Sequence, residues 1–160
     1  MLRYFKNSHR RRIAPLLDRA LQLGTQQTVM PVEIFNLARE LADVPNRNAT
    51  VAATEDMLLA HENAFVRRVF FTMLRFMGKT GLPNNDISAL LLRGLHDPSP
   101  WVQYDAAWAI AAQGLCTADI IDRLRVLADG YTGDETISPS DSAESVKKRA
   151  GATLCVIQKA

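Results

Sequence analysis

Hydrophobic residues recur at the spacing of an α-helix along most of the chain. Apolar side chains three or four residues apart share one helix face, as Ile34, Leu37, Ala38 and Leu41 do. No segment alternates apolar and polar residues in the way that a half-buried strand requires. The pattern predicts an all-α fold with helices over residues 9–23, 31–43, 50–61, 64–78, 86–96, 100–113, 118–129 and 143–158.

Short polar segments rich in glycine and proline separate the predicted helices. In the segment DPSP, residues 97–100, Ser99 is a natural N-cap and Pro100 a natural first helical residue. Gly114 is placed to end the helix that follows. The segment over residues 130–142 is polar and acidic, and we expect a loop there.

The predicted helices repeat along the chain. Val66 and Val102 occupy equivalent places 36 residues apart, and Val146 follows Val102 after 44 residues. The helices before them align as well, because Leu95 and Leu127 are equivalent at an offset of 32 residues. The third unit therefore carries 12 extra residues, which coincide with the acidic loop. An insertion that leaves both flanking helices in phase is what a repeat tolerates in a loop.

The segment LLLRGLHDPSPWVQYDAAWAIAAQG, residues 90–114, resembles the HEAT repeat. That pattern is a leucine-rich helix, Asp-Pro-Ser-x-x-Val, and a second helix with paired alanines and a terminal glycine. Residues 51–78 resemble it less closely, and residues 119–158 do so once the loop is removed. The residues that match are Leu91, Leu95, Asp97, Pro98, Ser99, Val102, Ala106, Ala107 and Gly114.

The resemblance implies a short right-handed α-solenoid of about four helix pairs in a single domain, residues 1–160. Residues 1–45 would form a degenerate first pair, and the repeats would cover 50–78, 86–114 and 118–158. The chain departs from the family pattern at Gln103, where a basic residue is common; Arg67 and Lys147 keep it.

Composition narrows the class of protein. The hydrophobic fraction of 48% and the charged fraction of 22% are typical of a globular domain, and a net charge of +2 indicates no general affinity for nucleic acid or membranes. Cys116 and Cys155 make no disulfide framework, and we expect them to be small buried thiols. No apolar run reaches the length of a membrane span, so we expect a soluble cytoplasmic protein.

The sequence offers little support for catalysis. His9, His61 and His96 lack the spacing of a zinc site, and Cys116 has no evident base beside it. The string GKTG, residues 78–81, lacks the upstream glycine of a phosphate-binding loop. We therefore expect a protein that is not an enzyme, with no catalytic residue, no metal and no cofactor.

One helix face carries an unusual set of side chains: Trp101, Asp105, Trp108 and Ala112. Packing between repeats, with a salt bridge from Asp105 to Arg149, is the favoured interpretation, since aromatic stripes at helical spacing usually belong to the core. The other interpretation is a resemblance to HEAT-like alkylpurine DNA glycosylases. It implies that Trp101, Asp105 and Arg149 would form part of a site for a DNA base.

Because solenoids usually bind macromolecules, we expect a protein-protein interaction scaffold or adaptor, with an inhibitor or immunity protein as one form of it. The alternative is nucleic-acid binding, through basic residues at the starts of second helices, including glycosylase-type activity. The acidic loop would suit a basic protein partner. Membrane binding is not expected, and the oligomeric state stays open. The predicted partner-binding residues are Arg67, Arg68, Trp101, Gln103, Tyr104, Asp105, Trp108, Asp134, Glu135, Lys147 and Lys148.

Overall fold

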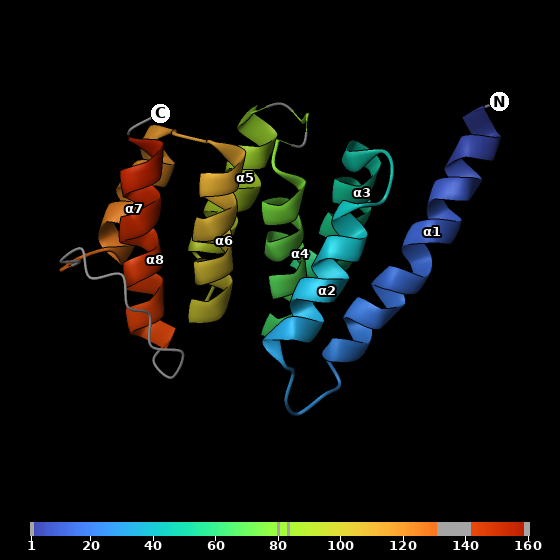
Figure 1. The fold of residues 1–160 in the computed structure, drawn as a ribbon, viewed down its shortest axis with the longest axis horizontal. Coiled ribbons are helices and arrows are strands. Elements are labelled where there is room, and N and C mark those ends of the chain that lie inside the picture. Colours follow the sequence, from blue (N-terminus) through green and yellow to red (C-terminus); the bar gives the residue numbers. More distant parts are fainter. Residues whose placement is uncertain (1, 80, 83, 131–141, 159–160) are drawn as a thin grey trace. The chain divides into compact units, whose positions relative to one another are not determined.

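A computed structural model describes residues 2–79, 81–82, 84–130 and 142–158 of the chain (Figure 1). The described residues form helices and turns without a strand, which confirms the predicted all-α class. The elements are α1 (Leu2–Leu23), α2 (Pro31–Ala42), α3 (Arg47–Thr54), the π-helix η1 (Glu55–Leu59), α4 (Ala64–Met77), α5 (Asn84–Leu95), α6 (Pro100–Gln113), α7 (Ala118–Leu127) and α8 (Ser142–Ile157).

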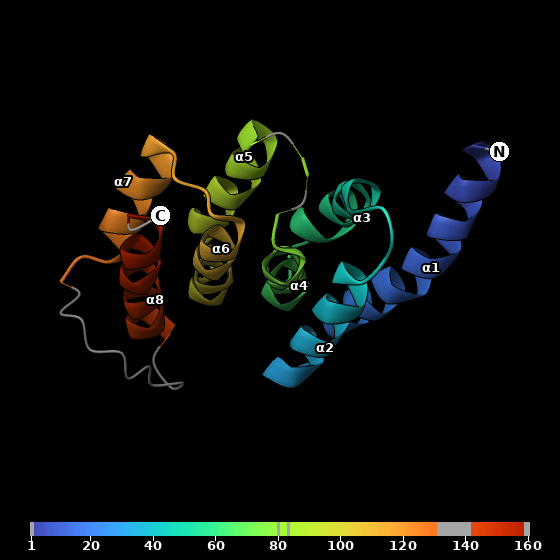
Figure 2. The ribbon, with the colours of Figure 1, turned by 45° about the horizontal axis from the view of Figure 1, so that its top comes forward.

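The helices form two compact units, the first over Met1–Gly81 and the second over Leu82–Ala160. In the second unit α5 packs beside α7, and α6 packs beside α8, so two layers face each other (Figure 1, Figure 2). In the first unit α2 packs beside α4, and α1 packs against α2, α4 and η1. In the second unit α5 also packs against α6, and α7 packs against α8. The predicted repeats, the single domain and the continuous solenoid stay predictions.

Each unit has its own apolar core. In the first unit Ile34, Leu58 and Phe70 are fully enclosed, and in the second unit Leu91 and Ile110 are. These residues come from the helical stripes that the apolar spacing predicts, and burying such a stripe is the main driving force for packing one helix on another.

Helix boundaries follow local chemistry. Ser99 is the N-cap of α6 with Pro100 as its first residue, and Gly114 ends the helix in the left-handed conformation, as predicted. Ser99 makes no side-chain cap bond; instead its backbone N–H donates to Asp97 Oδ1 at 2.8 Å. In the first unit the backbone N–H of Asn63 donates to His61 Nδ1 at 3.0 Å. The acceptors lie 36 residues apart, so the two helix pairs repeat this turn as well as the apolar pattern.

The predicted helix over 50–61 differs from the structure. It begins earlier, where Asn46 Oδ1 accepts from the backbone N–H of Ala49, and it changes to a π-helix after Thr54. The Thr54 hydroxyl lies within 2.8 Å of the Thr50 carbonyl oxygen and 2.9 Å of that of Val51. Side-chain bonds to preceding carbonyls bend helices, and this one sits where the π-turn starts.

The structure also bears on the predictions for the two cysteines, for the first helix and for membrane-spanning segments. Cys116 and Cys155 are exposed, so the prediction of buried thiols is wrong: Cys116 lies in the turn before α7, and Cys155 lies on an outer face of α8. Helix α1 begins at Leu2 rather than at residue 9. Within the described ranges, no helix has both the length and the apolar character needed to cross a bilayer.

Candidate functional site

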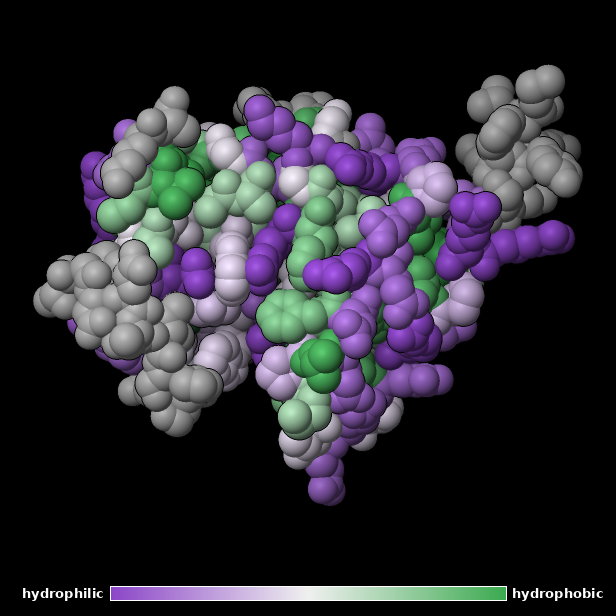
Figure 3. Space-filling model, viewed as in Figure 1, coloured by the Kyte–Doolittle hydropathy of each residue, from purple (hydrophilic) through white to green (hydrophobic). Residues whose placement is uncertain are grey.

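Three aromatic side chains on α6 and one arginine on α8 form a connected cluster, here called the α6–α8 surface. Its members are Trp101, Tyr104, Trp108 and Arg149, and each side chain is partly exposed. The spacing of three and four residues aligns the rings along one strip of α6, next to α8. On the face that Figure 3 shows, residues of intermediate hydropathy lie beside strongly hydrophilic ones over these two helices.

The rings meet edge to face. Trp101 and Tyr104 have centroids 5.8 Å apart, and Tyr104 and Trp108 have centroids 5.7 Å apart. The guanidinium carbon of Arg149 lies 3.8 Å from the centre of the Trp108 ring and 5.2 Å from that of Tyr104. Arg149 Nη2 also donates to the Tyr104 hydroxyl at 3.3 Å. A stacked guanidinium of this kind is held in place by the attraction between its charge and the ring faces.

The predicted salt bridge from Asp105 to Arg149 is wrong. Arg149 lies on Trp108 instead, and Asp105 is buried with 3% of its surface exposed. The reason is the way α8 is rotated against α6. The Thr153 hydroxyl donates to the Ala107 carbonyl oxygen at 2.9 Å, and this bond shows which face of α6 meets α8. This bond places α8 beside the strip of α6 that runs through residues 104, 107 and 108. Asp105 is about 100° around the helix from Tyr104 and about 60° from Trp108, so it lies at the edge of that strip, where it is buried.

The basic run on α8 does not form one patch. Consecutive helical residues point in different directions, and here each finds a different neighbour. Lys147 Nζ lies against Gly130, only 3.0 Å from where a methyl group would sit on that glycine. Lys148 Nζ lies 3.7 Å from Glu144 Oε1 one turn earlier. Among these neighbours, only Arg149 joins the α6–α8 surface.

Two other predicted partner-binding residues bond within their own helix pair. Arg67 Nη1 donates to the carbonyl oxygens of His61 and Glu62 at 2.8 and 2.6 Å. Gln103, 36 residues later, donates through Nε2 to the carbonyl oxygen of Asp97 at 2.7 Å. A neutral amide thus makes the bond that arginine makes 36 residues earlier.

The remaining predicted residues divide into two groups. Arg68 is buried on α4, at 9% exposure, so little of its side chain is available to a partner. Asp134 and Glu135 lie outside the described residues, and so does the acidic loop at 131–141. Across the described ranges, no three His, Cys, Asp or Glu side chains gather in a way that could hold a metal ion.

The first unit contains a second arginine-aromatic cluster that the sequence analysis missed. Phe35 of α2 and Phe76 of α4 meet edge to face at 6.3 Å. Arg39 stacks over Phe76 at 5.0 Å, and Arg75 lies 5.7 Å from Phe35 and 5.4 Å from Phe76. The signal in the sequence is the i, i+4 spacing of Phe35 and Arg39, but that spacing alone does not reveal the partner helix.

One exposed ion pair ties α1 to α2. Arg19 donates to both carboxylate oxygens of Glu40, at 2.6 and 3.0 Å. These hydrogen bonds hold the pKa of Glu40 below its usual range and raise the pKa of Arg19. Both side chains stay about half exposed, so solvent screens the pair and its contribution to stability is small.

The chain was compared with protein-family models, with curated proteins and with solved structures, and none of the three comparisons gave a match. Two features of the side-chain geometry stand out: the α6–α8 surface in the second unit, and a pocket in the first unit between α1 and the α3–η1 segment.

Proposed function

We propose that this chain is a non-enzymatic, HEAT-like protein-binding module whose partner binds at the α6–α8 surface. The observation that carries the proposal is the partly exposed stack of Arg149 on Trp108, with Tyr104 and Trp101 beside it. Tryptophan, tyrosine and arginine are the residues that most often dominate the energetics of protein interfaces. Here all three types meet in one connected cluster.

The arginine stack also suggests what the partner presents. A guanidinium held flat against a ring has lost most of its conformational freedom before binding, so ordering it costs the complex little. Its N–H groups lie in the plane of the guanidinium, in the fork that matches a carboxylate. We therefore expect a partner segment with an Asp or Glu for Arg149 and an apolar side chain for the exposed edges of Trp101 and Trp108.

A basic partner remains a separate prediction, because it rests on Asp134 and Glu135 in the acidic loop. The two predictions are compatible, since a partner can present an acidic segment to Arg149 and basic groups to the loop. Either contact would act through charge complementarity, which favours fast and specific association more than high affinity.

Nucleic acid is the competing partner, because aromatic rings and arginine also stack on bases. Two observations favour protein. Lys147 and Lys148 lie against Gly130 and Glu144, so they add no continuous basic track to the cluster. The Asp105 carboxylate, which glycosylase-type chemistry would need at a base, is buried.

The test is affinity capture with matched variants of the full chain, with and without nuclease. Trp108→Ala removes the ring under Arg149, and Tyr104→Phe removes only the hydroxyl that Arg149 contacts. Val126→Ser is the control, because Val126 is an exposed apolar residue of another helix of the same unit, α7. Thermal unfolding of each variant first establishes that it folds.

The expected result is one protein captured by the wild type and by Val126→Ser, resistant to nuclease, and lost with Trp108→Ala. Titration of that protein should then show at least about tenfold weaker binding for folded Trp108→Ala, the usual scale for an interface anchor. Tyr104→Phe should lie between the two. If nuclease releases all bound material, or if no captured protein distinguishes Trp108→Ala from the control, the proposal is wrong.

A further inference from the structure

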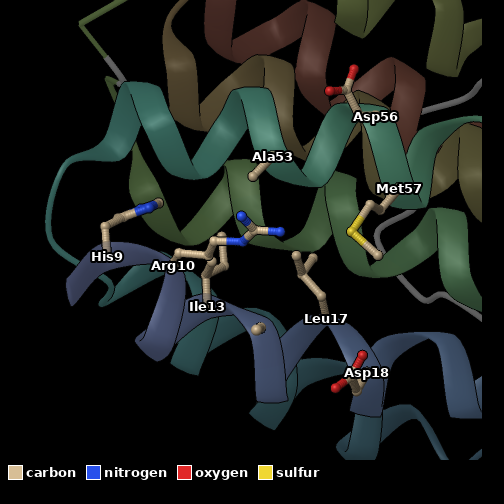
Figure 4. A pocket seen from close by; sticks show the side chains of 9 residues that line it. His9, Arg10, Ile13, Leu17, Asp18, Ala53, Asp56 and Met57 are labelled. Atoms are coloured by element: carbon tan, nitrogen blue, oxygen red, sulfur yellow. The ribbon is translucent and has the colours of Figure 1, made fainter. Parts of the chain in front are cut away.

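The first unit holds a pocket of about 430 Å³ between α1 and the α3–η1 segment (Figure 4). One face of α1 lines it on one side, and Ala53, Asp56 and Met57 line it on the other. Its floor is apolar, with the buried side chains of Ile13 and Leu17. A volume of this size falls in the range of ligand-binding pockets.

The local structure explains why the two helices leave space here. At the place where neighbouring helices would interdigitate, the α3 side offers only the methyl group of Ala53. Directly after it, at Thr54, the α-helix widens into the π-turn. Such π-turns inside helices are often found at functional sites.

A hydrogen bond fixes one end of the pocket. His9 Nε2 lies 3.1 Å from Thr50 Oγ1 and joins α1 to α3. The Thr50 hydroxyl also lies 3.2 Å from the Asn46 carbonyl oxygen in its own helix. The spacing between the helices is thus set by a directional contact at this end as well as by packing.

The charges of the pocket are divided between its two ends. Figure 4 shows His9 at one end, the Arg10 side chain reaching from there toward Ala53, and Asp18 and Asp56 toward the other end, with the Asp56 carboxylate turned away from α1. Eight residues of α1 separate Arg10 from Asp18, which corresponds to about 12 Å along the helix axis. Arg10, Asp18 and Asp56 are all exposed, so the pocket is open along its rim.

Met57 adds an adaptable wall. Its side chain is 41% exposed, and it belongs to both the π-turn and the pocket. A thioether chain rearranges at low cost, and for that reason methionine recurs on surfaces that accept varied apolar side chains. Since the rim is open and the floor is apolar, the pocket suits a segment that continues past both ends.

We infer that this pocket binds a short peptide segment of a partner protein, with an apolar side chain between an acidic and a basic one. The acidic group would face Arg10, the apolar group would cover Ile13 and Leu17, and the basic group would face Asp18 and Asp56. In an extended chain, residues i, i+2 and i+4 share one side and span about 13 Å, which matches the pocket. The site lies in the first unit, so the inference is independent of the α6–α8 surface.

Three labelled peptides test the inference by fluorescence anisotropy with the full chain. The first, Gly-Glu-Ala-Leu-Ala-Lys-Gly, places its glutamate, leucine and lysine on one side of the extended chain. The second carries glutamate at both charged positions, and the third carries lysine at both. Because the second and third peptides each carry the same residue at both charged positions, they are symmetric, and the comparison does not depend on the direction in which a peptide lies.

Variants of the chain localise the binding. Ala53→Leu fills the pocket, and Ala52→Leu makes the same change at an exposed neighbouring position of α3 that does not line it. We expect the mixed-charge peptide to bind wild type and Ala52→Leu equally, and Ala53→Leu at least about tenfold more weakly. Arg10→Glu should change the preference to the two-lysine peptide, and Asp18→Lys with Asp56→Lys to the two-glutamate peptide.

Circular dichroism of each variant checks folding, and if Ala53→Leu fails to fold, the charge variants decide. The inference is overturned if no peptide binds the wild type up to about 1 mM, or if neither the pocket-filling nor the charge changes alter binding. It is also overturned if the chain self-associates through this pocket. Sedimentation would then show an oligomer that Ala53→Leu dissociates.

Discussion

The guanidinium carbon of Arg149 lies 3.8 Å from the centre of the Trp108 ring, so α8 and α6 are joined by a stacked cation as well as by apolar packing. A double-mutant cycle measures this contact directly. We expect Trp108→Leu and Arg149→Met to couple by about 1 kcal/mol, the scale of a partly desolvated cation–π pair. Urea unfolding followed by tryptophan fluorescence reports on the second unit, because both tryptophans of the chain lie in α6 and Trp101 remains in every variant.

Arg125→Met is the control for this cycle. Arg125 is an exposed arginine of the same unit that pairs only with Asp122 one turn away. Its loss should change the free energy of unfolding by less than about 0.5 kcal/mol. A coupling between Trp108 and Arg149 no larger than the experimental error would mean that the stack adds nothing to the joint between the helices.

Gln103 and Arg67 make the same bond in successive helix pairs, and they should therefore be interchangeable. Gln103→Arg should leave the stability of the second unit within about 0.5 kcal/mol of wild type, because arginine reaches the same carbonyl in the first unit. Gln103→Ala should cost about 1 kcal/mol, because the Asp97 carbonyl oxygen loses its donor. Denaturation monitored by tryptophan fluorescence distinguishes the two, and equal destabilisation by both variants would argue against the repeat equivalence.

Local rules explain what could be predicted of the fold. The apolar spacing located each α-helix of the described residues, because a helix face must be apolar wherever it is buried. Several boundaries differ, and the start of α1 differs by seven residues. Ser99, Pro100 and Gly114 were placed correctly because capping depends on a few neighbouring residues. The 36-residue offset also reflects local structure, because the turns at the two equivalent places make the same backbone-to-side-chain hydrogen bond.

The candidate site was only half predictable. The spacing of Trp101, Tyr104 and Trp108 showed that they share a strip of α6, but it could not show how α8 is rotated against that strip. The hydrogen bond from Thr153 to Ala107 shows that rotation. With this rotation, Arg149 stacks on Trp108 rather than pairing with Asp105. Contacts of this type join residues more than 40 positions apart, beyond the reach of any periodicity.

Gly24 is predicted to be a packing glycine. It ends α1 against the start of α4, where its carbonyl oxygen accepts from Asn63 Nδ2 at 3.1 Å. A methyl group on it would lie 3.0 Å from the His61 ring and 3.1 Å from Val66 Cγ2. Gly24→Ala should therefore destabilise the first unit by about 1 kcal/mol, measured by thermal unfolding with circular dichroism.

The sign of the Gly24→Ala effect separates crowding from chain entropy. In an uncrowded and unstrained turn, the same substitution stabilises a protein, by about 0.4–1 kcal/mol, because alanine restricts the unfolded chain. Gln26→Ala, in the same turn and exposed, is the matched control and should change little. A more stable Gly24→Ala variant would show that His61 and Val66 yield without cost.

The ion pair between Arg19 and Glu40 predicts a small and pH-dependent contribution to stability. The pKa of Glu40 is lowered in the folded chain, chiefly by its hydrogen bonds from Arg19. Its contribution is therefore fully present above the unfolded pKa, about 4.3, and is lost as the pH falls through the lower folded value. At pH 7, Glu40→Gln should lower the free energy of unfolding by less than about 1 kcal/mol, because the pair is exposed.

The pH series distinguishes this ion pair from a packing effect. The difference between wild type and Glu40→Gln should vanish as the pH is lowered through the acidic range, and it should shrink in about 1 M salt, where charges a few ångströms apart are screened. Glu62→Gln, an exposed carboxyl of the same unit, is the control. A Glu40→Gln deficit that persists unchanged at low pH and at high salt would mean that the side chain stabilises α1 on α2 through packing of its methylene groups, with the charge making no contribution.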